Sequence, residues 1–203
     1  MTQREIREFL AERESQKDRT IVIVDFSNVE KWKDSLGWSV GIRELGNLVK
    51  CFSGTKALRR FYYGSDYGRF ESSTTLRAWS RSMLEKAKMN GFSIVTKRVK
   101  YMHSESAQGG FETKCDLDVE MAVDLIWERD NYDTMVVFSG DGDLSYAIKY
   151  LASEFDKKCI VFGARDRIGR ELIDAKDEGH IQSLLYAEDF EYRLSMARRN
   201  RGR

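Results

Sequence analysis

The sequence contains no proline, so glycine and polar capping residues must set the ends of its helices. Its 3 cysteines are far apart and include no C-x-x-C pair, which argues against a disulfide framework and against a zinc knuckle. This cysteine usage fits a reducing, cytoplasmic compartment. No apolar run approaches the roughly 20 residues that cross a bilayer, so we expect no membrane partner.

A strong excess of one charge is also missing. The 34 lysines and arginines nearly balance the 33 aspartates and glutamates, which leaves a net charge of +1. Without an overall basic field, any contact with nucleic acid must come from local patches. With 203 residues and 41% hydrophobic content, the chain can build one domain with a proper core and short appended arms.

The two ends of the chain differ from its middle. Residues 1–19 carry both charge signs at helical spacing and lack the apolar core of a signal peptide, which predicts a solvated helical arm. This arm is also the candidate surface for a homodimer. Residues 187–203 become increasingly basic, and they predict a helix or tail that adds non-specific affinity or merely solubility.

The middle of the chain alternates short apolar runs with helical patterns. Helical spacing predicts helices at 41–52, 72–90, 118–128, 143–154 and 168–177. Continuous apolar runs predict buried strands at 20–26, 57–64, 92–102, 134–139, 158–163 and 180–186, with 103–115 as a mobile loop. This alternation predicts an α/β fold, a three-layer α/β/α sandwich with a mainly parallel central sheet of five or six strands.

Two of these strands end in aspartate. Asp25 follows the run TIVIV, and Asp141 and Asp143 follow MVVFSG. In the common strand order 3-2-1-4-5 the first and fourth strands are neighbours, about 4.8 Å apart, so these acids would meet at one sheet edge. Three clustered carboxylates cannot all stay ionised without a cation. Mg²⁺ or Mn²⁺ is the natural partner, because these hard ions favour carboxylate ligands.

The pair Asp141 and Asp143 also has a purely structural interpretation, because Asp-Gly-Asp is common in turns and at helix N-caps. The coincidence with Asp25 at a matching strand end is what favours a site. A calcium-binding EF-hand does not fit, since Tyr146 stands where that loop needs glycine.

A fourth acid comes from the helix predicted at 118–128. Its apolar stripe of Val119, Ala122, Val123 and Ile126 is expected to face the core. Asp118 then lies about 90° from the stripe, in the first turn, where it can lean over the sheet edge. On spacing alone, Asp118 serves equally well as an acid that favours the helix dipole. Asp124 lies farther round the helix.

The segments that carry these acids resemble a known family. IVIVDFSNVE, KCDLDVEMAVDL, SGDGDLSYAIKYL and KKCIVFGA, in this order, resemble the NYN domain, a branch of the PIN-like nucleases, over about residues 20–186. The resemblance implies a PIN-like sandwich with Mg²⁺- or Mn²⁺-dependent ribonuclease activity that leaves 5′-phosphate and 3′-hydroxyl ends. It implies catalytic and metal-holding roles for Asp25, Asp118, Asp141 and Asp143, with Asn28, Ser139 and Asp124 as supporting polar groups.

The chain departs from the family pattern before the helix at 118–128. The family often has Lys-Gly-Val-Asp there, whereas this chain has Lys-Cys-Asp-Leu-Asp, one residue longer. The role of Lys114 is therefore open, and Asp116 is an additional acid close to the cluster.

An RNA partner needs cations and stacking surfaces. The candidates for nucleic-acid contact are Trp32, Arg69, Lys114 and Arg165. Each of them has an alternative role without RNA, either as a solubilising surface charge or as an aromatic ring packed on the core. Neither His103 nor His180 has an acid partner near a predicted strand end, so we do not expect a metal-free ribonuclease with two histidines.

Three other functional classes are open. The domain could be an RNA- or protein-binding regulatory module of the same fold, which the presence of all four acids disfavours. A phosphatase of the haloacid-dehalogenase type also begins with a strand and an aspartate, but it needs a second aspartate where Ser27 stands. A toprim-like enzyme usually has glutamate at the position of Asp25. The ribonuclease is the favoured hypothesis.

Overall fold

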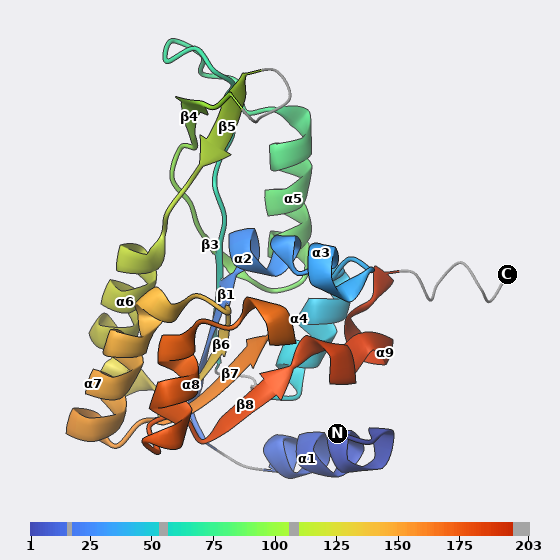
Figure 1. Cartoon of the computed structure of the whole chain (residues 1–203), viewed down its shortest axis with the longest axis vertical. Coiled ribbons are helices and arrows are strands. Elements are labelled where there is room, and N and C mark those ends of the chain that lie inside the picture. Colours follow the sequence, from blue (N-terminus) through green and yellow to red (C-terminus); the bar gives the residue numbers. More distant parts are fainter. Residues whose placement is uncertain (16–17, 53–56, 106–109, 197–203) are drawn as a thin grey trace, which may run out of the picture.

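A six-stranded parallel sheet forms the centre of the computed structural model, which describes residues 1–15, 18–52, 57–105 and 110–196 (Figure 1). The strand order is β3-β2-β1-β6-β7-β8, so the first strand lies beside the fourth strand of this sheet, as predicted. The strands are β1 (Thr20–Asp25), β2 (Leu58–Tyr62), β3 (Ser93–Val95), β6 (Thr134–Phe138), β7 (Lys158–Gly163) and β8 (Ser183–Tyr186).

Helices cover both faces of this sheet. One face carries α6 (Asp118–Trp127), α7 (Ser145–Phe155) and α8 (Arg170–Asp177), and the other carries α4 (Ile42–Lys50) and α5 (Ala78–Met89). Alternate residues of β1 point into the two cores, since Val22 and Val24 pack on the α4 side while Ile21 and Ile23 pack on the α6 side. The predicted α/β fold with a parallel sheet is confirmed.

Short segments connect these elements. They are α2 (Phe26–Lys31), α3 (Lys33–Leu36), α9 (Glu191–Leu194) and the 3₁₀ turns η1 (Arg129–Asn131), η2 (Gly142–Leu144), η3 (Arg165–Arg167) and η4 (Ala187–Phe190). None of the helices in the described ranges is both long enough and apolar enough to cross a membrane.

The N-terminal helix α1 (Gln3–Ser15) forms where it was predicted, and most of its residues are exposed, but it docks on the core through a few apolar side chains. Ile6 and Leu10 are buried in the core on the α4 side, and the ring of Phe9 lies 6.0 Å from that of Phe52. Two apolar residues one helical turn apart suffice to dock the helix, although charge dominates its composition.

The C-terminal segment is also part of the core as far as the structure describes it. Phe190 and Leu194 are fully buried, and the Leu194 carbonyl accepts a hydrogen bond from Gly41 N at 2.9 Å. Over residues 187–194 the predicted helix or tail is a helical segment, formed by η4 and α9, and it packs on the core instead of extending from it. The arginine-rich residues 197–203 lie outside the described residues.

The third predicted strand and the loop after it are wrong in part. Only β3 joins the sheet, and the chain then forms an antiparallel hairpin of β4 (Lys100–His103) and β5 (Phe111–Lys114). After β3 the chain keeps only an isolated parallel bridge between Ser65 and Arg98, and the side chains of Lys97, Arg98 and Lys100 are exposed. The hairpin and α5 rise beyond the sheet edge where β1 gives way to α2 (Figure 1). The helix predicted from residue 72 begins only at Ala78.

Candidate active site

Asp25 ends β1 and begins α2. Its carboxylate accepts hydrogen bonds from Asn28 N and from the Ser139 hydroxyl, both at 3.1 Å, and the residue is 8% exposed. Burial raises the pKa of Asp25 to about 6, with a further rise from the charge of Asp141. The two hydrogen bonds lower the pKa but do not cancel the cost of burial. The two hydrogen bonds thus hold Asp25 in a buried position where water solvates its ionised form poorly.

Ser139 connects the two strand ends. Its hydroxyl donates to Asp25 Oδ2, and its oxygen accepts the N–H of Asp141 at 3.1 Å, so one hydroxyl uses its single proton and a lone pair. The strands meet here because β1 and β6 pair in parallel, with Val24 opposite Phe138. Ser139 therefore fixes the spacing between Asp25 and the loop that carries Asp141.

Asn28 makes a second connection between the same segments. Its side-chain oxygen accepts hydrogen bonds from Gly140 N at 3.0 Å and from Trp32 Nε1 at 2.8 Å. Asp141 in turn begins η2, where its Oδ1 accepts the N–H of Asp143 at 3.1 Å. The Asp-Gly-Asp segment is thus both a turn and part of a wider arrangement with α2.

Asp118 brings the third segment, as the first residue of α6. Burial raises its pKa to about 7, with further increases from a hydrogen bond to Asp116 and from the charges of Asp141, Asp116 and Asp25. The pKa of Asp116 moves the other way, because the Asp118 side chain and N–H both donate to it. The two neighbouring carboxyl groups are therefore shifted in opposite directions, with Asp118 the one that is harder to ionise.

The acids form one field of negative charge. Asp25, Asp118 and Asp141 act on one another although they lie on three separate segments, and Lys31 lowers the pKa of Asp25 less than Asp141 raises it. Asp143 lies at the exposed rim of this group. Such hard carboxylate oxygens are the donors that Mg²⁺ and Mn²⁺ prefer.

The arrangement is open rather than closed around an ion. Within the described ranges, no three His, Cys, Asp or Glu side chains form a group ready to ligate a metal. Mg²⁺ commonly takes only one or two carboxylates directly and keeps several waters, so an open group of acids fits it. The donor set suits a hydrated divalent cation.

A family model of the NYN domain matches residues 19–184. This chain belongs to the NYN domain family. Over 87 residues it is 34% identical to the low amplitude and bright protein LabA of Synechococcus elongatus. That match covers 43% of this chain and 46% of LabA, so it spans less than half of the relative.

The fold of this NYN domain is shared with a crystal structure of a protein of unknown function from Vibrio parahaemolyticus. The two superpose with a TM-score of 0.61 at 18% identity, over 86% of this chain and 96% of the other. At that identity the likeness shows the fold alone. The family and the architecture together give this chain a PIN-like, nuclease-type fold.

The predicted inward face of α6 in this NYN domain is wrong. Val119 is 71% and Val123 53% exposed, whereas Leu117, Met121 and Leu125 are buried. Two apolar stripes compete in this helix, and the one that faces the core starts at Leu117, before the predicted helix begins. Asp118 still reaches the acids because it directly follows that buried leucine.

Asp124 does not lie with the supporting polar groups. It accepts a hydrogen bond from the Tyr62 hydroxyl at 2.6 Å and forms an ion pair with Arg60, which also pairs with Glu128. Six residues separate Asp124 from Asp118, which is about 9 Å along the helix axis. Its contacts join α6 to β2, and they have a structural role.

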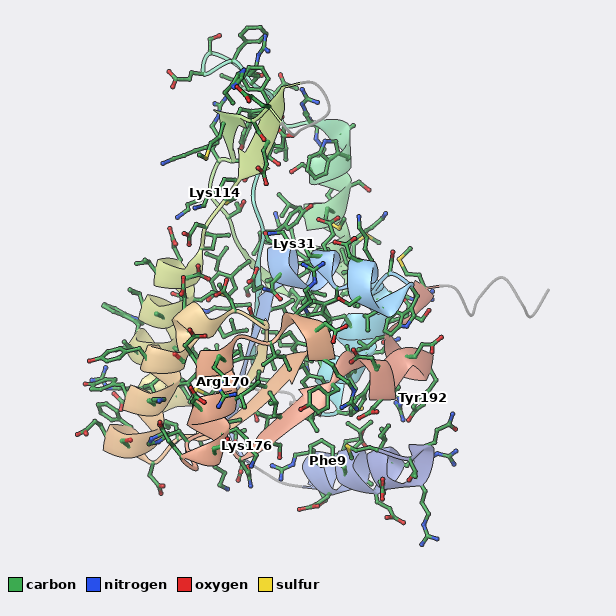
Figure 2. All side chains as sticks on the ribbon, viewed as in Figure 1. Phe9, Lys31, Lys114, Arg170, Lys176 and Tyr192 are labelled. Atoms are coloured by element: carbon green, nitrogen blue, oxygen red, sulfur yellow. The ribbon has the colours of Figure 1, made fainter. Side chains whose placement is uncertain are left out.

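The candidate nucleic-acid contacts comprise one buried residue and three exposed ones. Trp32 is wrong as a stacking surface, because its ring is fully buried and its N–H holds Asn28. Arg165 lies 3.9 Å from the centre of the Tyr186 ring and pairs with Asp189. Lys114 is exposed at the base of the β4–β5 hairpin (Figure 2), and Arg69 lies over the rings of Phe70 and Phe111.

Sequence reasoning missed the glycines that let this loop pack. A Cβ on Gly140 would lie 1.9 Å from the Arg167 carbonyl oxygen, and Gly169 N donates to the Gly140 carbonyl at 2.8 Å. The acid-bearing loop thus packs with its backbone against the chain that enters α8. The glycines beside the two acids are the signal that could have indicated this close approach.

Proposed function

We propose that this NYN domain is a divalent-metal-dependent endoribonuclease, with Mg²⁺ or Mn²⁺ as its cofactor and RNA as its partner. The observation that best supports the proposal is that the Ser139 hydroxyl joins Asp25 to the backbone of Asp141, with Asp118 close enough for the charges of both acids to raise its pKa. Desolvation and mutual repulsion raise the pKa values of Asp25 and Asp118, and a divalent cation would relieve both costs.

Asp25, Asp118, Asp141 and Asp143 would hold the ion, which when bound supplies an acidified water and charge stabilisation for the leaving 3′ oxygen. Ser139 keeps Asp25 and the Asp141 backbone at a fixed spacing. Because burial raises the pKa of Asp118, binding of a cation there would be accompanied by loss of a proton as the pH falls toward that pKa. Hydrolysis adds one water across the P–O3′ bond and leaves a 5′-phosphate and a 3′-hydroxyl, without a side-chain nucleophile.

A second candidate is a catalytically inactive module of the same fold that binds RNA or a protein. One observation favours it, because no three acids among the described residues form a ready-made ligand group. An RNA-cleavage assay separates the two candidates.

The assay uses end-labelled single-stranded and structured RNA with Mg²⁺, Mn²⁺ or EDTA. We expect cleavage only with metal, and a loss of roughly 100-fold or more in Asp141→Asn, because that change removes a charge aimed at the reacting centre. Asp177→Asn is the matched control, since Asp177 is an exposed acid at the end of α8.

Cleavage that survives both EDTA and Asp141→Asn would contradict the metal mechanism. Metal-dependent binding without any cleavage would support the inactive module. Hydrolysis of phosphate monoesters alone would favour the phosphatase instead.

A further inference from the structure

A cavity of about 830 Å³ lies outside the group of acids. It is open to solvent and is lined by residues of the β4–β5 hairpin, of the start of α5 and of the loop before α5. These elements lie in the part of the molecule that rises beyond the sheet edge (Figure 1). Its volume falls within the range of pockets that hold small organic ligands. Aromatic rings and guanidinium groups dominate its lining, among them Tyr67, Phe70, Phe111, Arg69, Arg77 and Arg81.

The walls of this cavity are held in place by hydrogen bonds. Asp66 is 2% exposed, and its carboxylate accepts hydrogen bonds from the Tyr101 hydroxyl at 2.8 Å and from Gly68 N at 2.6 Å. Arg98 donates to the carbonyls of Phe70, Glu71 and Ser73, at 2.7 to 3.1 Å. The loop is therefore ordered by the protein itself, and the cavity exists before any ligand binds.

The lining has a positive charge. It includes three arginines and no acidic side chain within the described part of the chain. Arg69 lies 5.4 Å from the Phe70 ring centre and 4.7 Å from that of Phe111, and Arg77 approaches the buried Asp66 only to 3.8 Å. Flat rings beside guanidinium groups suit a ligand that combines a planar base with a phosphate.

The cavity and the acids are joined by a short segment. Phe111 lines the cavity, β5 ends at Lys114, and α6 begins at Asp118. Seven residues separate Phe111 from Asp118, which spans at most about 25 Å of extended chain. The acids Asp25 and Asp141 lie at or just after the carboxyl ends of β1 and β6, and the hairpin that lines the cavity rises beyond this edge of the sheet (Figure 1). One RNA strand of several nucleotides can therefore contact both.

We propose that this cavity, the arginine–aromatic pocket, binds an unpaired nucleotide of the RNA strand that lies on the acids, and so restricts the substrate to single-stranded RNA. The proposal rests on the proposed function, because it assigns a substrate class to that site. A base in a duplex has both faces covered by its neighbours and cannot enter the pocket, whereas an unpaired base can stack on Phe70 or Phe111. Phe70 is 68% exposed, so its ring is accessible.

The test measures binding rather than cleavage. Fluorescence anisotropy in EDTA compares a labelled RNA without self-complementarity with the same RNA in a blunt duplex. In Phe70→Ala we expect single-strand affinity to fall about 5- to 150-fold, the range for the loss of one stacked base, with duplex affinity unchanged. Phe70→Tyr keeps a ring and should restore the affinity.

The matched control is Arg129→Ala, since Arg129 also stacks on a ring, that of Phe155, but outside the pocket. Arg69→Ala should act as Phe70→Ala does, and Arg129→Ala should not. Because Phe70 is exposed, its loss leaves the core intact, which a thermal melt verifies.

Equal losses for single strand and duplex in Phe70→Ala would overturn the proposal, because they would indicate contact with the backbone alone. Unchanged binding of both RNAs would also overturn it and would leave the pocket to a ligand other than RNA. Failure of the proposed function has a different signature, namely a wild-type protein that does not cleave RNA with Mg²⁺ or Mn²⁺.

Discussion

Adding Mg²⁺ to the metal-free protein is expected to raise its thermal midpoint at pH 8 and to have little effect at pH 5. The reason is the raised pKa of Asp25, about 6, and of Asp118, about 7, in the folded state. The folded protein binds these protons more tightly than the unfolded chain does. The contribution of Asp25 and Asp118 to the stability of the metal-free protein is therefore fully present below pH 4 and is lost as the pH rises through 6 and 7.

The magnitude follows from Asp25, which is almost fully buried. A rise from 3.8 to about 6 corresponds to roughly 3 kcal/mol once the carboxylate is ionised. Asp118 contributes in the same direction, and because it is only half-buried its share is reduced by solvent. For a domain of this size, relief of 3 kcal/mol raises the thermal midpoint by about 6 to 12 °C.

The assay is a thermal melt across pH 4 to 8, with EDTA or with Mg²⁺. Asp141→Asn removes one of the repelling charges, so it should flatten the pH dependence and reduce the response to Mg²⁺. Asp177→Asn should behave as the wild type, because Asp177 is an exposed acid outside the site. A metal-free midpoint that rises between pH 5 and 8, or an equal Mg²⁺ response at both ends of that range, would refute the reasoning.

Two substitutions test the packing around the acids, and a third tests the docking of α1. Ser139→Ala leaves the N–H of Asp141 and an oxygen of Asp25 without their hydrogen-bond partner. We therefore expect a loss of about 1–3 kcal/mol of unfolding free energy in a denaturant titration and at least a tenfold drop in RNA cleavage. Full activity would show that cleavage does not need the spacing that Ser139 sets between Asp25 and Asp141. Gly140→Ala forces a methyl group against the Arg167 carbonyl. It should lower the free energy of unfolding by about 1–3 kcal/mol and weaken RNA cleavage. An unchanged thermal melt would mean that the loop of Gly140 can move away from Arg167. Ile6→Ala should lower the free energy of unfolding by about 2–5 kcal/mol in a urea titration, because Ile6 packs in the core. RNA cleavage at low temperature should stay intact, because α1 lies outside the site. An unchanged free energy of unfolding would mean that α1 is not docked in solution.

The sheet could be predicted because its central strands are apolar on both faces. TIVIVD and TMVVF have no other plausible structure, and their lengths fixed the position of Asp25 and of the acids after β6. The convergence of Asp25 and Asp141 then followed from the common strand order. No comparable pattern indicates where β3 ends, because apolar and polar residues alternate only weakly in the basic segment that follows it.

Helix faces and loop contacts could not be predicted in the same way. In α6, Leu117, Met121 and Leu125 compete with an equally regular stripe that includes Val119 and Val123, and only tertiary packing decides between them. The arginine–aromatic pocket depends on Asp66 and on contacts between segments more than 30 residues apart, such as the one between Asp66 and Tyr101. Periodicity carries no information about such contacts.

The carboxylate of Asp25 has two duties, because it caps the N-terminus of α2 and also faces the other acids. Selection on folding alone would therefore retain it whether or not the domain hydrolyses RNA. If the proposed ribonuclease activity were lost in a related sequence, we expect the first change at Asp143, whose exposed side chain does least for the scaffold. The presence of the β1 aspartate in such a sequence is thus poor evidence of an active enzyme.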